Sequence, residues 1–356
     1  MKPEDDPLSY RDQCSRFLLY HGNRPAAALL DAIPRDVKMD RYGDGGVVAE
    51  LEAEVGKLLG KPAVAFFPSG TMAQQAAMRV HADRSGCDAI GFHGTSHLEI
   101  HEDKAYQRLH GLVGVTLGSP RRLITLADLK AVPEDLAAVL IELPQREIGG
   151  QLPSWEALTE QVAYIRERGW AVHLDGARLW ESQPFYGRPH AEIAGLFDTV
   201  YVSFYKGLGG LAGACLAGEP DVIKEARAWR KRMGGTLFGM WPNAATALAG
   251  LRERLPRMPV YADHARAIAK ALHGVPGVEV VPAEPQTPMF HLHVRASEDG
   301  LRAAMVRLAK ERGLFTWGGS VPGYTPSTRL LEFTVGEATL GFAPEEVAAI
   351  VKELVP

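Results

Sequence analysis

The chain has few cysteines and lacks a long hydrophobic run. Its three cysteines, Cys14, Cys87 and Cys215, are unevenly spaced among 356 residues, a pattern that favours neither a disulfide framework nor a zinc site. No apolar stretch approaches the roughly 20 residues that span a bilayer. The acidic N-terminus also lacks the apolar segment of a signal peptide. We therefore expect a cytoplasmic protein without a membrane partner.

Blocks of one charge are also missing. The 39 Lys and Arg and 43 Asp and Glu residues are mixed along the chain, for a net charge of −4. A nucleic-acid partner would favour a basic stripe interleaved with aromatic residues, so we expect none. The chain is 46% hydrophobic, and its length allows a sizeable core and two domains.

Apolar segments alternate with helical patterns from about residue 42. We expect strands at 63–67, 89–92, 137–142, 171–174, 199–203 and 213–217, and helices at 71–82 and 154–168. Nearly continuous apolar strands separated by helices predict an α/β fold with a largely parallel sheet. Ligands of such sheets bind at the carboxyl ends of the strands.

Three charged residues follow the ends of two of these strands. Lys206 precedes a glycine-rich run, and glycines allow the close backbone approach that covalent chemistry at a lysine needs. Asp175 and Arg178 follow strand 171–174. Together they match the needs of a pyridoxal phosphate (PLP) enzyme: a lysine for the covalent link, an aspartate for the ring nitrogen, and an arginine for a substrate carboxylate. The ordinary alternatives are a solvated strand end and an Asp-Gly turn.

Ser69, Gly70 and Thr71 lie between strand 63–67 and the following helix. Two hydroxyls and a glycine at a helix start suit an anion, although Ser69 could equally be an ordinary N-cap.

Residues 173–178 (HLDGAR) and 203–209 (SFYKGLG) resemble the paired signatures of the threonine aldolase and β-eliminating lyase family of fold-type I PLP enzymes. The resemblance runs from about Tyr42 to the C-terminus. It implies an aspartate aminotransferase-like fold with a mainly parallel seven-stranded sheet. It also implies a homodimer or homotetramer, with Ser69, Gly70 and Thr71 as the phosphate-binding loop. Gln74 stands where family members usually carry asparagine.

The expected domains follow this pattern. Residues 1–40, polar and irregular, form an N-terminal arm that joins the smaller domain or a partner subunit. Residues 41–242 form the large, PLP-binding domain, and residues 243–356 form a small α+β domain. In the last of these we expect helices at 243–255, 260–273, 298–311 and 344–354, and strands at 278–281, 289–294 and 330–335.

The resemblance also assigns His97, Gln145 and Arg329. In the family a histidine stacks on the cofactor ring, and His97 occupies its place. The less favoured alternative is a metal site formed by His97 with the nearby Glu99, His101 and Glu102, and we expect no metal. Gln145 replaces a histidine that acts on the substrate β-hydroxyl, and glutamine can orient a hydroxyl but cannot take its proton. An arginine at the position of Arg329 grips the substrate carboxylate, although strand-end arginines are mostly solvated.

Two further departures surround the substrate. The family's Arg-Gln pair after a glycine run, which holds phosphate across the dimer, is absent, so Arg230, Lys231 or Arg232 would have to replace it. An N-terminal Ser-Asp-Thr segment is also absent, with residues 20–24 (YHGNR) near its position.

The leading hypothesis is a PLP-dependent aldolase that cleaves a threonine- or allo-threonine-like amino acid to glycine and an aldehyde. His97, His101, His21 or a water positioned by Gln145 could take the hydroxyl proton. Phe238 and Trp241 could line a pocket for a bulkier side chain. The alternatives are a β-eliminating lyase, a dinucleotide-binding oxidoreductase suggested by residues 207–212 (GLGGLA), and a binding protein that has lost catalysis.

Overall fold

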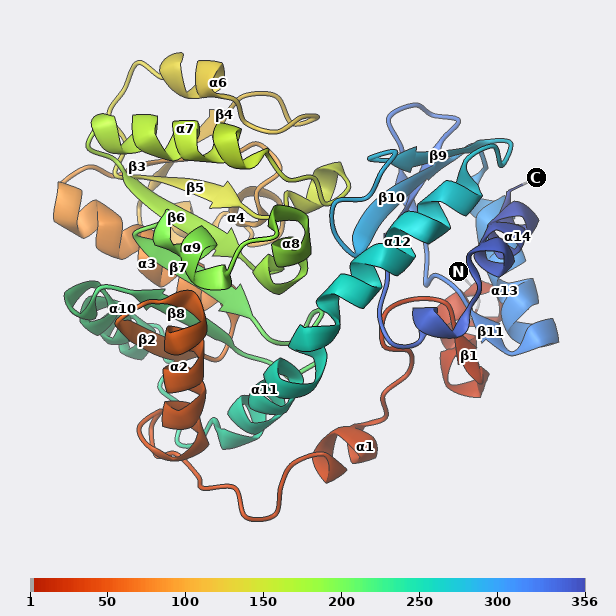
Figure 1. The fold of residues 1–356 in the computed structure, drawn as a ribbon, viewed down its shortest axis with the longest axis horizontal. Helices are drawn as coiled ribbons and strands as arrows, with labels where there is room; N and C mark the ends of the chain where they lie inside the picture. Colours follow the sequence, from red (N-terminus) through yellow and green to blue (C-terminus); the bar gives the residue numbers. More distant parts are fainter. Residues whose placement is uncertain (1–2, 356) are drawn as a thin grey trace. The chain divides into compact units, whose positions relative to one another are not determined.

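The computed structural model describes residues 3–355, which form two compact units (Figure 1). The small unit contains the chain up to Ala28, Ile148–Gln151 and the chain from Arg257 onward. The large unit contains Leu29–Glu147 and Leu152–Pro256. Helix α1 (Ala26–Asp31) spans the boundary between them in sequence.

These bounds differ from the expected ranges 1–40, 41–242 and 243–356. Helix α11 (Trp241–Arg254) was expected to open the small domain, but it belongs to the large unit. It packs against α2 (Gly46–Leu59), and Arg252 of α11 forms ion pairs with Glu50 and Glu54 of α2. The division therefore falls after Pro256.

A seven-stranded sheet forms the centre of the large unit within the described residues, as expected. Its strands, in spatial order, are β2 (Ala63–Phe67), β8 (Ala214–Gly218), β7 (Thr199–Ser203), β6 (Ala171–Gly176), β5 (Ala138–Glu142), β3 (Ala89–His93) and β4 (Val113–Leu117). Strand β8 is antiparallel to β2 and β7, and the other neighbouring pairs are parallel.

All strands of this sheet except the edge strand β4 are buried on both faces, which explains why they are apolar without alternation. Ala65 and Phe67 of β2 pack with helix α3 (Gly70–Ser85) in one hydrophobic cluster. Side chains that alternate with these, such as Phe66, Leu174 and Val202, point to the opposite face and are also fully buried.

The remaining helices of the large unit lie between these strands in sequence, except α10 (Pro220–Arg232), which follows the last of them, β8 (Figure 1). They are α3 (Gly70–Ser85), α4 (His97–Ile100), α5 (Ala105–Arg108), α6 (Leu126–Lys130), α7 (Trp155–Glu167), α8 (Leu179–Tyr186), α9 (His190–Gly195) and α10 (Pro220–Arg232). A short 3-10 turn, η3 (Arg146–Ile148), follows β5. Helix α3 runs across the strands from β2 to β3, so its first residues lie near several strand ends.

The small unit contains an antiparallel sheet in the order β12 (Val321–Pro322), β13 (Arg329–Thr334), β10 (Met289–Val294) and β9 (Val278–Val281). Strands β1 (Arg16–Phe17) and β11 (Leu314–Phe315) pair in parallel. Its helices are α12 (Met258–Leu272), α13 (Glu298–Arg312) and α14 (Pro344–Leu354). Helices α12 and α14 pack together.

Among residues 3–355, no helix is both long and apolar enough to cross a membrane.

Candidate functional site

The carboxyl ends of β5, β6 and β7 converge on one pocket of the large unit. Glu142, the last residue of β5, is the register partner of Asp175 in β6, and Asp175 is the partner of Tyr201 in β7. Partners in a parallel sheet point to the same face. The pocket is lined by Gly70, Thr71, Gln74, His97, Glu142, Pro144, Arg146, Asp175, Ala177, Arg178, Tyr201, Tyr205 and Lys206.

Asp175 is buried and held by two donors. Gln74 Nε2 donates to Asp175 Oδ2 at 2.8 Å, and the backbone N–H of Ala177 donates to Oδ1 at 3.1 Å. Asp175 is only 1% exposed. Gln74, which stands in place of the family's asparagine, is thus a direct partner of the carboxylate that the sequence analysis singled out.

Lys206 is half-buried and lies in an unfavourable place for a positive charge. Burial, reinforced by the Arg178 guanidinium, lowers the pKa of Lys206 to about 8, although the carboxylates of Asp175, Glu142 and Glu181 act in the opposite direction. A lower pKa leaves more of the amine uncharged near neutral pH, and the uncharged amine is the nucleophile.

Glu142 is a carboxylic acid of the pocket with a strongly raised pKa. Burial and the neighbouring Asp175 raise the pKa of Glu142 to about 8, while the backbone N–H of Arg146 and the Lys206 ammonium lower it. Glu142 was not predicted as a site residue from the sequence. The available signal was a carboxylate at the end of an apolar run, in the same strand-end position as Asp175.

Ser69, Gly70 and Thr71 form the start of α3. Ser69 Oγ accepts a hydrogen bond from the backbone N–H of Met72 at 3.2 Å, so Ser69 is the N-cap of α3. This is the ordinary role that the sequence left open beside anion binding. Gly70 and Thr71 line the pocket. A Cβ on Gly70 would lie 2.0 Å from Tyr201 Oη, so this position has no room for a side chain.

Tyr201 and Tyr205 add two hydroxyls to the same region, and the sequence analysis missed both. Burial raises the pKa of each phenol. Both therefore stay neutral and can donate. Their signal in the sequence was limited to aromatic residues just before Lys206.

His97 lies at the first position of α4 and lines the pocket. Its Nδ1 is 2.8 Å from Glu102 Oε1. His101, one turn later, instead pairs with Glu147 at 2.9 Å. Of the two histidines, His97 belongs to the pocket lining.

Arg178 is buried at the start of α8, where its Nη1 lies 3.4 Å from Glu181 Oε1. The same oxygen accepts from the backbone N–H of Gly207 at 3.2 Å. Glu181 therefore connects Arg178 with the residue that follows Lys206.

Gln145 is buried behind the pocket and is not among its lining residues. Its Nε2 donates to Glu142 Oε2 at 2.8 Å and to Thr95 Oγ1 at 3.3 Å. Arg329 belongs to the small unit, where it donates to the Oγ and carbonyl oxygen of Ser320 and pairs with Glu298 at 3.2 Å.

The candidate phosphate-binding basic residues lie on α10. Arg230 is buried and donates to the carbonyl oxygen of Phe66 at 2.5 Å, while Lys231 and Arg232 are exposed.

Phe238 and Trp241 do not line the pocket. Residues 207–212 lead into strand β8, whereas a dinucleotide-binding turn leads into a helix.

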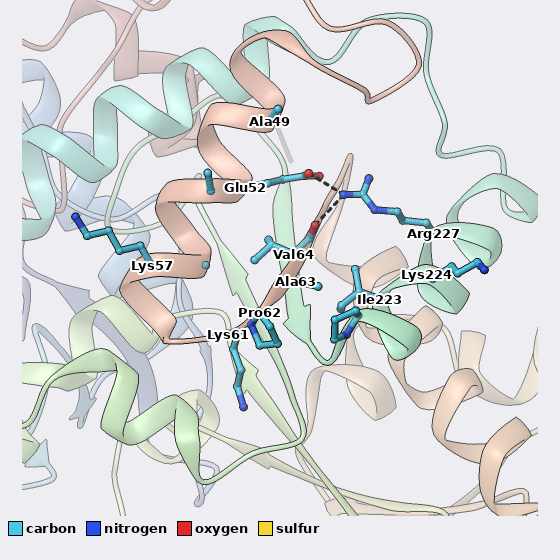
Figure 2. A pocket seen from close by; sticks show the side chains of 13 residues that line it. Ala49, Glu52, Lys57, Lys61, Pro62, Ala63, Val64, Ile223, Lys224 and Arg227 are labelled. Atoms are coloured by element: carbon cyan, nitrogen blue, oxygen red, sulfur yellow. Dashed lines mark hydrogen bonds and ion pairs between the residues drawn. The ribbon is translucent and has the colours of Figure 1, made fainter.

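A second hollow in the large unit lies between α2, β2 and α10 (Figure 2). Arg227 crosses it to donate to Glu52 Oε2 at 2.7 Å and to the carbonyl oxygen of Val64 at 2.8 Å. It contains none of the predicted site residues.

Within residues 3–355, no group of three or more His, Cys, Asp and Glu side chains is arranged to hold a metal ion.

Comparison with known proteins agrees with this fold. The beta-eliminating lyase family profile matches residues 25–295. A Listeria monocytogenes structure, provisionally assigned as an L-allo-threonine aldolase, is 38% identical, with a TM-score of 0.92, and the match covers 99% of each chain. An Exiguobacterium structure, provisionally assigned as an aromatic amino acid beta-eliminating lyase/threonine aldolase, is 36% identical, also with a TM-score of 0.92, over 99% of this chain and 100% of that one. The low specificity L-threonine aldolase of Escherichia coli K12 is 31% identical over 70% of this chain and 76% of its own length.

Proposed function

The chain belongs to the beta-eliminating lyase family, and from this premise we propose that it is a PLP-dependent aldolase that cleaves a β-hydroxy-α-amino acid to glycine and an aldehyde. The observation that carries the proposal is the position of Lys206, a lysine with a lowered pKa in one pocket with the buried carboxylate of Asp175.

The residues of the pocket fit PLP. Asp175 offers a buried acceptor for a protonated ring nitrogen, and Lys206 offers an amine for the covalent link. The start of α3 presents backbone N–H groups at a glycine without space for a Cβ, which suits a phosphate. His97 would cover the ring, and one of Arg230, Lys231 and Arg232 would complete the phosphate site.

The remaining roles concern the substrate. PLP, when bound, accepts the electron pair released at Cα when a bond to Cα breaks. Arg178 and Arg329 would hold the substrate carboxylate, so that the Cα–Cβ bond is oriented for cleavage. Gln145 donates to Glu142 and Thr95, so we propose that it acts on the substrate hydroxyl through a bound water or through Glu142.

A β-eliminating lyase remains the second candidate, because both reactions use the same lysine and aspartate. The observation that favours it is the absence of the usual histidine at Gln145, which removes one hydroxyl base. In that reaction Lys206 would remove the Cα proton and a group on Cβ would leave.

We further propose that the protein is a cytoplasmic homodimer or homotetramer. Support comes from the α10 cluster of Arg230, Lys231 and Arg232, whose exposed members could complete the phosphate site of a neighbouring subunit.

Product analysis tests the reaction. PLP-loaded protein is incubated with threonine, allo-threonine and bulkier β-hydroxy amino acids, and glycine and aldehyde are measured. We expect slow release from threonine or allo-threonine and faster release from a bulkier substrate. A Lys206→Ala protein should release neither product. Pyruvate and ammonia from serine, without glycine from any β-hydroxy substrate, would establish the lyase instead.

A further inference from the structure

A buried carboxylate stands behind the ring of His97. The side chain of Glu102 is 0% exposed, and both of its oxygens are engaged. Oε1 accepts from His97 Nδ1 at 2.8 Å, and Oε2 accepts from Gln75 Nε2 at 2.5 Å. Gln75 lies on α3 and is 1% exposed. Three side chains thus connect the buried side of α3 with the lining of the pocket.

The donors and acceptors in this chain have one consistent direction. An ionised carboxylate only accepts hydrogen bonds, so the His97 nitrogen that faces Glu102 must carry a proton. The amide of Gln75 supplies the donor for the other carboxylate oxygen. In a neutral imidazole the second nitrogen is then unprotonated. Within residues 3–355, the His97 ring makes no other hydrogen bond, so Nε2 keeps a free lone pair.

The local backbone holds His97 and Glu102 on one side of the chain. The four-residue helix α4 ends with the backbone N–H of His101 donating to the His97 carbonyl at 3.0 Å. Asp103 and Lys104 then adopt left-handed conformations, with φ of 47° and 55°, which non-glycine residues adopt at a cost. Lys104 also pairs with Glu99 at 2.7 Å. These two left-handed residues follow Glu102 directly, between α4 and α5.

We propose that Gln75 and Glu102 are positioning residues that fix His97 with its proton on Nδ1, so that Nε2 accepts the hydroxyl proton of the substrate. This deepens the proposed aldolase function and rests on it for the identity of the substrate. His101 does not fit the same task, because it lies outside the pocket lining and its Nε2 is engaged by Glu147.

The proton balance of the step is simple. The β-hydroxyl proton moves to His97 Nε2 as the oxygen forms the aldehyde C=O bond and the Cα–Cβ bond breaks, its electron pair staying with Cα. His97 becomes an imidazolium that keeps its Nδ1–H bond to Glu102. A buried carboxylate beside the ring stabilises this positive charge where it develops, as in other carboxylate–histidine pairs. The proton later leaves His97 for solvent or product.

The first test uses the protein without cofactor. Nitrogen-15 NMR of the histidine side chains, with His97 assigned from a His97→Gln protein, reports which ring nitrogen carries the proton. We expect the Nδ1–H form in the wild type and a loss of that preference in Glu102→Gln and Gln75→Leu. Glu147→Gln removes the carboxylate partner of His101 in the same way and should leave His97 unchanged. A wild-type His97 in the Nε2–H form would overturn the proposal, as would an unchanged tautomer in both folded variants.

The second test uses PLP-loaded protein and the best β-hydroxy amino acid. We expect Glu102→Gln and Gln75→Leu to lower kcat by roughly 100-fold, the lower range for loss of a general base, with KM changed little. Glu147→Gln should retain turnover. An altered tautomer with unchanged kcat would show that His97 is not the proton acceptor. If no β-hydroxy substrate is cleaved while the tautomers behave as expected, the proposed function fails and the positioning of His97 stands.

Discussion

Gly70 shows how one residue type is dictated by its surroundings. Tyr201 is buried on β7, so its phenol is packed on all sides. A Cβ at Gly70 would lie 2.0 Å from Tyr201 Oη and 2.6 Å from Cζ, much closer than van der Waals contact. The glycine therefore lets the start of α3 lie against the end of β7, and the pocket forms at this approach.

We predict that Gly70→Ala destabilises the protein by about 1–3 kcal/mol, as overpacked substitutions do, and weakens PLP binding. Gly195→Ala is the matched control, because Gly195 is also helical but has no atom within 4 Å of an added Cβ. It should be neutral or stabilising by up to about 1 kcal/mol. Urea unfolding and titration with PLP measure both effects. Equal stability of the two variants would show that Tyr201 yields to the methyl group.

At the scale of elements, a buried polar link joins α3 to two strands. His81 Nε2 of α3 and His173 Nδ1 of β6 each lie 2.8 Å from Thr199 Oγ1 of β7. The hydroxyl can donate to one ring and accept from the other, so both of these ring nitrogens have a partner while the rings stay neutral. Burial lowers the pKa of His81 to about 4, with Asp198 opposing and Arg84 adding to the shift. Burial, followed by the nearby His81, lowers the pKa of His173 well below its usual value.

This link predicts a loss of stability in mild acid. A histidine in the unfolded chain binds a proton near pH 6.5. In the folded state burial keeps His81 neutral to about pH 4, and it lowers the pKa of His173 well below its usual value. The unfolded state therefore binds more protons below pH 6.5, and the free energy of unfolding falls as the pH falls through this window. The contribution of each ring to this slope rises to about 1.4 kcal/mol per pH unit as the pH approaches 5, where the unfolded ring is almost fully protonated.

His81→Gln should flatten this slope by up to about 1.4 kcal/mol per pH unit, because glutamine can keep a hydrogen bond to Thr199 but does not titrate. Thr199→Ser, which retains the hydroxyl, should leave the slope unchanged. Urea unfolding of the protein without cofactor at several pH values between 6.5 and 5 gives the slopes. If His81→Gln and the wild type lose stability in parallel, His81 does not contribute.

The elements that could be predicted from sequence are those with a strong apolar pattern. Strands β2, β5, β6 and β7 are buried on both faces, and their residue ranges follow the apolar runs closely. Strand β4 escaped prediction because it is a sheet edge with a glycine and partly exposed residues, which weaken the pattern.

The candidate site residues that could be predicted are those whose own position in the sequence, near the end of an apolar run, indicates a role. Asp175 lies near the end of β6 and Lys206 follows β7, and the structure brings both into one pocket. The partners of these residues depend on contacts between segments far apart in sequence, which no local pattern encodes. Examples are the bond from Gln74 to Asp175 and the register that sets Glu142 beside it.

At the scale of the whole molecule, one exposed apolar patch of the large unit is built from two loops. We define the loop patch as Met39, Tyr42, Leu237 and Phe238, which are 69%, 53%, 42% and 65% exposed. The rings of Tyr42 and Phe238 lie 5.4 Å apart, and the backbone N–H of Tyr42 donates to the Phe238 carbonyl. Asp40, itself buried, bonds the backbone of both loops through Gly43 and Met240. The patch is therefore ordered while its apolar side chains are exposed, as expected of an interface.

We predict that the loop patch lies in the subunit interface of the proposed homo-oligomer. Phe238→Asp places a charge among apolar side chains, and loss of an aromatic hot spot costs about 2 kcal/mol or more, equivalent to roughly 30-fold weaker association. Sedimentation should then show a smaller species at concentrations where the wild type is associated. Leu109→Asp is the control, because Leu109 is 70% exposed on the large unit outside the patch; it should sediment as the wild type does. Because the proposed phosphate site is completed by a neighbouring subunit, the dissociated Phe238→Asp protein should also bind PLP more weakly. A wild-type protein that sediments as an active monomer would contradict both the interface and the shared site.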